Sequence, residues 1–252
     1  MVMDKLDKKT ILLKIGTATL TRGTDNISRG KLEDIARQIL ELKDDYHFII
    51  VCSGAIAAAK QFIQLEKFGD GIKEKQALAA IGQPHLMRLI QETFRELNLH
   101  VAQCLLSYYD FTNQQSKENI INTLNILLQN GVIPIINEND TVATDEIKFG
   151  DNDKLSALTA ILMEVDLLIL ATNTYGLYNE EKKTVEEVQD IESVKKYIQQ
   201  QHSAQGTGGM QSKLEAAALA QNKQIETWLV NGHEEYFMIK ALNNKSAFTK
   251  IN

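Results

Sequence analysis

The stretch Phe48-Ile49-Ile50-Val51-Cys52, followed directly by Ser53-Gly54-Ala55, indicates the fold of this chain. Five consecutive apolar residues rich in β-branched side chains are typical of a parallel strand that helices cover on both faces. The small residues after it leave room for a ligand at the start of the next helix, where the helix dipole favours a carboxylate or a phosphate. An N-cap role for the serine is an equally simple interpretation.

The same alternation of short apolar runs and longer helical patterns extends along the chain. We expect strands at Thr10–Ile15, Phe48–Cys52, His100–Leu106, Val132–Ile136, Asp166–Ala171 and Ile225–Val230. We expect helices at Arg29–Lys43, Ala55–Leu65, Ile72–Leu97, Lys117–Gln129, Asp153–Glu164 and Gln211–Asn222. This pattern predicts an α/β protein, a three-layer α/β/α sandwich around a mainly parallel sheet, with a single domain over residues 1–252.

Composition excludes several classes of protein. A net charge of −6 and a pI near 5.5 argue against nucleic acid as the main partner. Cys52 and Cys104 have neither zinc-site spacing nor a disulfide framework, and we expect both to be buried free thiols. The polar start and the lack of an apolar stretch of membrane-spanning length predict no membrane contact and a cytoplasmic location.

A glycine-rich run, Gly206-Thr207-Gly208-Gly209-Met210-Gln211-Ser212-Lys213, precedes an alanine-rich helical pattern. Glycines let a backbone approach a ligand closely, and a helix start with a lysine in its first turns has the parts of a phosphate cradle. A flexible loop before an ordinary surface helix would use the same residues. The run is not a Walker A loop, because no Gly-x-x-x-x-Gly-Lys-Ser/Thr pattern occurs in the chain.

Polar residues follow the other expected strands, at the edge where open α/β sheets bind their ligands. Lys14-Ile15-Gly16-Thr17 offers a cation, backbone N–H groups and a hydroxyl to one phosphate, although a solvated lysine before a turn is the simpler alternative. Asn137-Glu138-Asn139-Asp140 suits an ammonium group or a metal, or caps the chain. Asp151-Asn152-Asp153 opens a helix, and Thr172-Asn173 suits a nucleotide's base or ribose, or a tight turn.

Six motifs in this order resemble the glutamate 5-kinase family of the amino acid kinase superfamily. They are Lys-x-Gly-Thr, Ser-Gly-Ala-Ile-Ala, Asn-Glu-Asn-Asp, Phe-Gly-Asp-Asn-Asp, Gly-Leu-Tyr and Gly-Thr-Gly-Gly-Met-x-x-Lys, and the resemblance runs from Thr10 to about Gly232. The resemblance implies transfer of the γ-phosphoryl group of ATP to the side-chain carboxylate of L-glutamate, the first step of proline synthesis. It implies the amino acid kinase fold as well.

The resemblance also implies roles for individual residues. Lys14 and Lys213 would flank the transferring group as catalytic residues, and Asp153 would hold them in place. Positions that match the family's glutamate site are Ser53, Asp140 and Asn152. Positions that match its ATP site are Lys14, Gly16, Thr17, Thr172, Asn173, Thr207, Gly208, Gly209, Met210, Gln211, Ser212 and Lys213.

Further expectations follow from the family. Mg²⁺ would be bound through the ATP phosphates with no direct protein ligand, a homodimer or tetramer would form, and proline would act as a feedback inhibitor. Three departures stand out: Thr172-Asn173 replaces the usual Thr-Asp, the chain stops at Asn252 without the PUA domain of many relatives, and the tail 245–251 only loosely resembles the family's closing strand. The alternatives are another superfamily member, such as a uridylate, acetylglutamate, aspartate or carbamate kinase, or a non-catalytic sensor of an amino acid or nucleotide.

Overall fold

A computed structural model describes residues 8–63, 69, 71–143, 152–200 and 209–252. Its strands, all in one sheet, are β1 (Lys9–Ile15), β2 (Tyr46–Cys52), β3 (His100–Leu106), β4 (Val132–Glu138), β5 (Leu167–Thr172), β6 (Glu187–Val188), β7 (Glu226–Asn231) and β8 (Thr249–Ile251). Within these described residues the order across the sheet is β3-β4-β2-β1-β5-β7-β8-β6. All neighbouring pairs are parallel except β7 and β8, so the expected mainly parallel sheet is confirmed.

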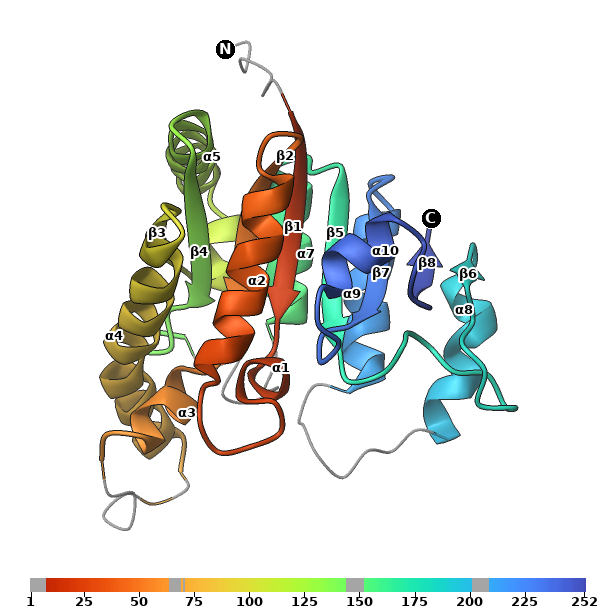
Figure 1. Ribbon diagram of the computed structural model, residues 1–252, viewed down its shortest axis with the longest axis horizontal. Helices are drawn as coiled ribbons and strands as arrows, with labels where there is room; N and C mark the ends of the chain where they lie inside the picture. Colours follow the sequence, from red (N-terminus) through yellow and green to blue (C-terminus); the bar gives the residue numbers. More distant parts are fainter. Residues whose placement is uncertain (1–7, 64–68, 70, 144–151, 201–208) are drawn as a thin grey trace.

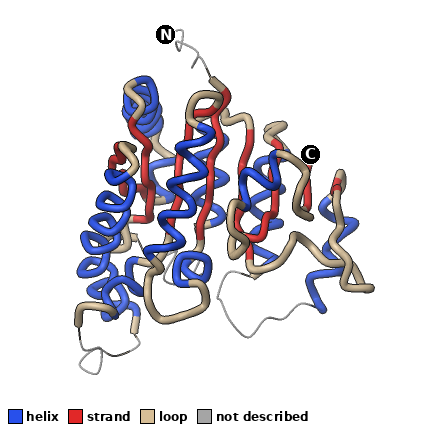
Figure 2. The backbone as a smooth tube through the Cα atoms, in the orientation of Figure 1, coloured by secondary structure: helices blue, strands red, loops and turns tan. Residues whose placement is uncertain are grey.

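The helices are α1 (Thr17–Thr21), α2 (Arg29–Leu42), α3 (Ala55–Lys60), α4 (Ile72–Glu96), η2 (Tyr108–Phe111), α5 (Gln114–Gln129), α7 (Asp153–Leu162), α8 (Ile191–Val194), η3 (Lys195–Gln200), α9 (Met210–Gln221) and α10 (Phe237–Leu242). Figure 1 shows α2 in front of the sheet and α7 behind it, and Figure 2 shows helices flanking the strands throughout. The layers are those of an α/β/α sandwich.

Alternating side chains along each strand build the two halves of the core. On β1, Leu12 packs with residues of α5, α7 and α9, whereas Ile11 and Leu13 pack with residues of α2, α4 and α10. All three β1 side chains are fully buried, as a parallel strand covered on both faces requires.

Most expected elements form within a few residues of their expected ends. The helix expected at Lys117 begins earlier, at Gln114, because the Asn113 side chain accepts a hydrogen bond from the Ser116 N–H and caps it there. The helix expected over Ala55–Leu65 ends at Lys60. Sequence patterns missed α1, α10 and β8, which are short and owe their form to tertiary packing.

Two further predictions from the sequence concern the cysteines and membrane-spanning helices. Cys52 is buried as expected, whereas Cys104 is only half-buried because β3 lies at the edge of the sheet. Across the described ranges, no helix combines the length and the apolar character that crossing a bilayer requires.

Candidate active site

The carboxyl ends of the central strands form the candidate active site. The connection from β1 to β2 runs through α2 on one face of the sheet, and the connection from β4 to β5 runs through α7 on the other. The sheet therefore grows in opposite directions on the two sides of the boundary between β1 and β5, which is a topological switch point. Open α/β sheets bind ligands at such a point. In Figure 1 the β1 and β4 arrows point toward the edge at which α1 and α3 lie.

Asp153 joins two lysines from distant parts of the chain. Lys14 ends β1 and places its Nζ 2.6 Å from Asp153 Oδ1, and Lys213 in α9 places its Nζ 2.9 Å from Asp153 Oδ2. The Ser212 hydroxyl donates to the same Oδ2 at 2.8 Å. Asp153 is fully buried, and the side chains of Lys14 and Lys213 are 3% and 13% exposed. The three catalytic candidates of the sequence thus lie together.

One carboxylate between two ammonium groups leaves a net positive charge in a nearly buried place. Without Asp153 the two lysines would repel each other, and with it they stay close enough to share one anionic ligand. A Cβ at Gly16 would lie 3.5 Å from Lys14 Nζ, so the glycine keeps the space beside that ammonium group open. This arrangement suits a phosphoryl group with developing negative charge.

A chain of buried amides runs from α7 across the sheet to α4. The Asn152 Nδ2 lies within hydrogen-bond distance of the Cys52 carbonyl (2.9 Å), Ser53 Oγ (3.2 Å) and Asn137 Oδ1 (2.7 Å). The Asn137 Nδ2 in turn donates to Gln83 Oε1 at 2.7 Å. These amides connect the elements that follow β2 and β4 with the long helix α4.

The capping alternatives for these residues are wrong. Asn152 occupies the N-cap position of α7, but its side chain makes no cap hydrogen bond. Ser53 precedes the N-cap residue of α3, which is Gly54 with a φ of 109°. The polar side chains of Asn152 and Ser53 therefore face each other across the site and do not cap their own helices.

Asp140 lies just after β4 and is only 8% exposed. Gln76 in α4 holds the turn by donating to the Asp140 carbonyl at 2.9 Å. The Asp140 Oδ1 is buried and finds no hydrogen-bond partner within the described part of the chain. Burial raises the pKa of this carboxyl from 3.8 to about 6. A cationic ligand would supply the missing partner.

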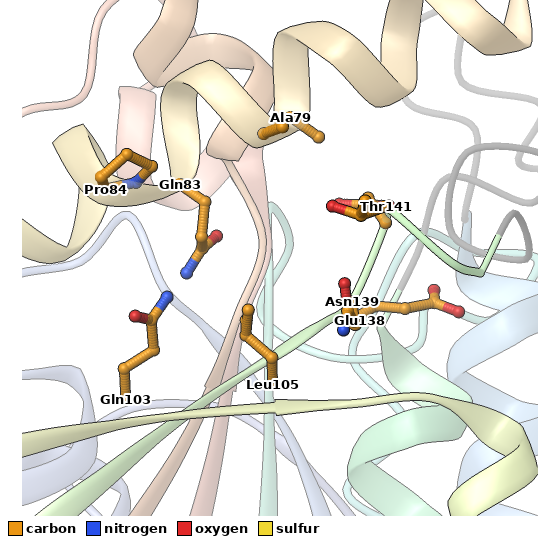
Figure 3. Close-up of a pocket in the computed structure, with 10 residues that line it drawn as sticks. Ala79, Gln83, Pro84, Gln103, Leu105, Glu138, Asn139 and Thr141 are labelled. Carbon is orange, nitrogen blue, oxygen red and sulfur yellow. The ribbon is translucent and has the colours of Figure 1, made fainter.

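A cavity of about 230 Å³ lies between α4 and the ends of β3 and β4. Its lining consists of Ala79, Ala80, Gln83, Pro84, Gln103, Leu105, Glu138, Asn139, Asp140 and Thr141. In Figure 3 the Gln83 side chain reaches from α4 into this space, and the Glu138 carboxylate points away from it. The cavity therefore shares Asp140 with the expected substrate site and adds polar groups from α4.

The end of β5 and the turn after it carry Thr172 and Asn173, two of the expected ATP-site residues. The Thr172 hydroxyl accepts from the Thr174 N–H at 3.1 Å, which closes the tight turn that the sequence left open as an alternative. Asn173 is exposed, and its Oδ1 lies 2.9 Å from His233 Nε2, just beyond the neighbouring strand β7. Burial, with Lys31 and Arg22 nearby, lowers the pKa of His233, so the imidazole is neutral at pH 7.

The remaining ATP-site candidates surround the start of α9. Gly209 precedes the helix, Met210 begins it, and the Gln211 side chain is bound to Glu215 on the same helix at 2.9 Å. Thr17 begins α1, beside Gly16. Thr207 and Gly208 lie outside the described residues.

Sequence reasoning missed two polar residues of this region. Gln83 has no distinguishing pattern, because a glutamine inside a helical stretch is usually an exposed residue, and only the fold shows that it is buried. His233 lies in none of the six motifs that carry the family resemblance. Its position after β7 could have singled it out, because neighbouring parallel strands bring their carboxyl ends together.

Within the described ranges, no group of three or more His, Cys, Asp or Glu side chains is arranged to hold a metal ion. The Asp153 carboxylate is already engaged by Lys14, Lys213 and Ser212.

Comparison with known proteins identifies the family of the chain. The profile of the amino acid kinase family matches residues 9–231. The chain belongs to the amino acid kinase family. It is 38% identical over 250 residues to the glutamate 5-kinase of Shewanella woodyi, covering 96% of this chain and 67% of the relative. The glutamate 5-kinase of Shewanella oneidensis is also 38% identical, over 260 residues, covering 100% of this chain and 70% of the relative.

Solved structures share the fold at low sequence identity. UMP kinase from Ureaplasma parvum superimposes with a TM-score of 0.65 at 16% identity, covering 98% of this chain and 97% of that one. Carbamate kinase from Giardia lamblia, bound to AMP-PNP, gives a TM-score of 0.67 at 14% identity, covering 97% and 98%. These likenesses confirm the amino acid kinase fold, and the chain spans about two thirds of the length of the curated glutamate 5-kinases.

Proposed function

We propose that this chain transfers the γ-phosphoryl group of ATP to the side-chain carboxylate of L-glutamate, giving L-glutamyl 5-phosphate and ADP. A carboxylate oxygen of glutamate forms the new P–O bond, and the bond from the γ-phosphorus to the bridging oxygen of ADP breaks. The acceptor is already ionised at neutral pH, since its ordinary pKa is near 4.3, so no general base is needed. The Asp153-bridged pair of Lys14 and Lys213 is the observation that carries the proposal.

The catalytic residues act by position and charge. Lys14 and Lys213 approach from β1 and α9, so they stabilise negative charge that develops on the transferring group and on the leaving ADP. Asp153 is a positioning residue, because its carboxylate is spent on holding the two ammonium groups. Gly16, Thr17 and the start of α9 provide the surroundings of the phosphates.

Substrate recognition rests on buried polar atoms that lack a partner among the described residues. Asp140 Oδ1 and Asn152 Oδ1 are buried acceptors for which the described residues supply no partner, and they fit the α-ammonium group of an amino acid. Ser53, at the start of the α3 turn, fits a carboxylate of the same molecule. A nucleoside monophosphate would place no cation opposite Asp140, which disfavours the uridylate kinase alternative.

Mg²⁺ belongs to the proposal as an ion carried by the ATP phosphates, where it neutralises charge. The lysine and serine contacts of Asp153 leave that carboxylate poorly placed to act as a metal ligand. Homo-oligomer formation and feedback inhibition by proline rest on the family resemblance, whereas the cytoplasmic location rests on the sequence pattern, and all three stay predictions.

The test is an ADP-release assay with the purified chain, ATP and Mg²⁺, run across glutamate, aspartate, acetylglutamate, carbamate and UMP. We expect turnover with glutamate above all others. Turnover with UMP and none with glutamate would overturn the assignment, and ATP binding without turnover of any acceptor would favour the sensor.

A second measurement examines the mechanism. Lys213→Ala removes one of the two ammonium groups that act in the transition state, so kcat should fall by about two orders of magnitude or more while KM for glutamate changes little. Lys183→Ala, at an exposed residue paired with Glu181, is the matched control. An unchanged kcat in Lys213→Ala would remove this lysine from the transition state.

A further inference from the structure

Gln83 carries a buried hydrogen-bond donor that none of the described residues satisfies. The residue is 9% exposed, and its Oε1 accepts from the Asn137 Nδ2 at 2.7 Å. That bond fixes the orientation of the amide and turns the Nε2 away from Asn137. The Nε2 is buried and has no hydrogen-bond partner within the part of the chain that the structure describes. An orphaned buried donor costs free energy unless a ligand completes it.

The orphaned donor lines the same cavity as the orphaned acceptor of Asp140. Both residues belong to the wall of the 230 Å³ space between α4 and the ends of β3 and β4. Figure 3 shows the Gln83 amide directed into that space. The remaining wall includes apolar groups such as Ala79, Pro84 and Leu105. A ligand that complements this cavity bears a cation for Asp140 and an acceptor for Gln83, on a small apolar frame.

A zwitterionic α-amino acid meets this description. We propose that the Gln83 Nε2 binds the α-carboxylate of the acceptor substrate, and that together with Asp140 it selects acceptors with an amino acid head group. This inference rests on the proposed function, because it assigns the α-end of the glutamate whose side chain is phosphorylated. The head group then lies in the cavity and the side-chain carboxylate extends toward Lys14.

Two contacts of α4, one through Gln76 and one through Gly82, hold the part of the helix that carries Gln83 in place. Gln76, two turns earlier on α4, binds the carbonyl of Asp140 at 2.9 Å, so the same helix face positions both sides of the head-group site. Gly82, next to Gln83, packs so closely on α3 that a Cβ there would lie 1.7 Å from the Ala55 carbonyl oxygen. The donor therefore belongs to a rigid element, which favours selective recognition.

Two substitutions separate substrate binding from a merely structural role. Gln83→Glu keeps an oxygen that accepts from Asn137 but replaces the donor by a second acceptor. Gln83→Met removes both groups at nearly the same volume. If Gln83 binds the α-carboxylate, both variants should raise KM for glutamate about 10- to 100-fold with little change in kcat. If Gln83 only holds Asn137, Gln83→Glu should keep the wild-type KM, and the proposal fails.

The control variant is Gln91→Glu. Gln91 lies at an exposed position of the same helix α4, and it is not part of the cavity wall, so this change adds the same charge outside the proposed head-group site. We expect a change in KM of less than about threefold, because no contact with the substrate is lost. An effect as large as that of Gln83→Glu would show that added charge on α4, and not the Gln83 donor, decides binding.

Substrate analogues supply a second readout through their Ki values against glutamate. Glutarate lacks the α-ammonium group and 4-aminobutyrate lacks the α-carboxylate. Gln83→Met should weaken the binding of glutarate about as much as that of glutamate, and it should change the Ki of 4-aminobutyrate by no more than about twofold. Equal losses for both analogues would overturn the assignment. Absence of glutamate turnover by the wild-type chain would instead refute the proposed function, so the two failures are distinguishable.

Discussion

In the proposed function, Asp140 binds the substrate at the expense of the stability of the fold. Its carboxyl is buried, and burial raises its pKa from 3.8 to about 6. Because the folded-state pKa is higher than the unfolded one, the protonated form stabilises the fold at low pH, and this contribution is lost as pH rises through about 6. Above that pH the protein holds a carboxylate that favours binding of a cation and disfavours the empty folded state.

Asp140→Asn should therefore have opposite effects on stability and activity. At pH 8 the free energy of unfolding should rise by roughly 2 kcal/mol, because the ionised carboxylate is gone, and at pH 4 the gain should nearly vanish. Glutamate turnover should fall at least about a hundredfold, because the α-ammonium loses its anionic partner. Urea unfolding at both pH values measures the first effect and the ADP-release assay the second.

The control is Asp25→Asn, at an exposed loop position, which should change stability by less than about 0.5 kcal/mol at either pH. In the wild type, KM for glutamate should rise as pH falls below about 6 and Asp140 takes up its proton. A gain in stability of equal size at pH 4 and pH 8 would contradict this account.

At the scale of elements, the close contact of α3 and α4 positions the substrate site. α3 begins right after Ser53 and Gly54, and α4 carries Gln76 and Gln83. Gly82 permits the contact, since a Cβ there would lie 1.7 Å from the Ala55 carbonyl oxygen and 2.7 Å from the Ala59 nitrogen. Backbone atoms cannot yield as a flexible side chain would, so the helices must separate if a larger residue is introduced.

Gly82→Ala should lower stability by roughly 1–3 kcal/mol, even though alanine has the higher helix propensity. It should also raise KM for glutamate, because separating the helices moves Ser53 and Gln83 apart. Gly30→Ala is the matched control: it lies in the exposed first turn of α2, where a Cβ meets only Ser28 Oγ at 4.0 Å, so it should be neutral or stabilising by up to about 1 kcal/mol. Equal changes in melting temperature for Gly82→Ala and Gly30→Ala would refute the role of close packing at Gly82.

The helices and strands differ in how well the sequence predicted them. Long buried strands and amphipathic helices were predictable because their patterns reflect local periodicity, and His100–Leu106 matches β3 at both ends. α10 and β8 were missed because their stability comes from packing, as in the pairing of β8 with β7 and β6. The proximity of Lys14, Asp153 and Lys213 was predictable from the family resemblance, and Lys14 also from its position at a strand end. The Gln83 donor was not, because it depends on which side of α4 faces β4.

At the scale of the whole molecule, Asp153 links parts of the chain that are far apart in sequence. Its carboxylate connects β1, through Lys14, with α9, through Lys213, while its own helix α7 packs against α9 and β5. Removing the Asp153 carboxylate would leave the neighbouring ammonium groups of Lys14 and Lys213 without the anion that they share. The cluster of Lys14, Asp153 and Lys213 thus also links strand β1 with helices α7 and α9.

Asp153→Asn should lower the free energy of unfolding by roughly 3–5 kcal/mol and nearly abolish turnover. It should also increase the thermal shift that AMP-PNP with Mg²⁺ produces, because the phosphates replace the lost anion between Lys14 and Lys213 and relieve their repulsion. Glu192→Gln, which removes an exposed ion pair with Lys195, should change neither stability nor the nucleotide shift measurably. A smaller nucleotide shift in Asp153→Asn than in the wild type would contradict this prediction and show that orientation of the lysines, more than their net charge, governs phosphate binding.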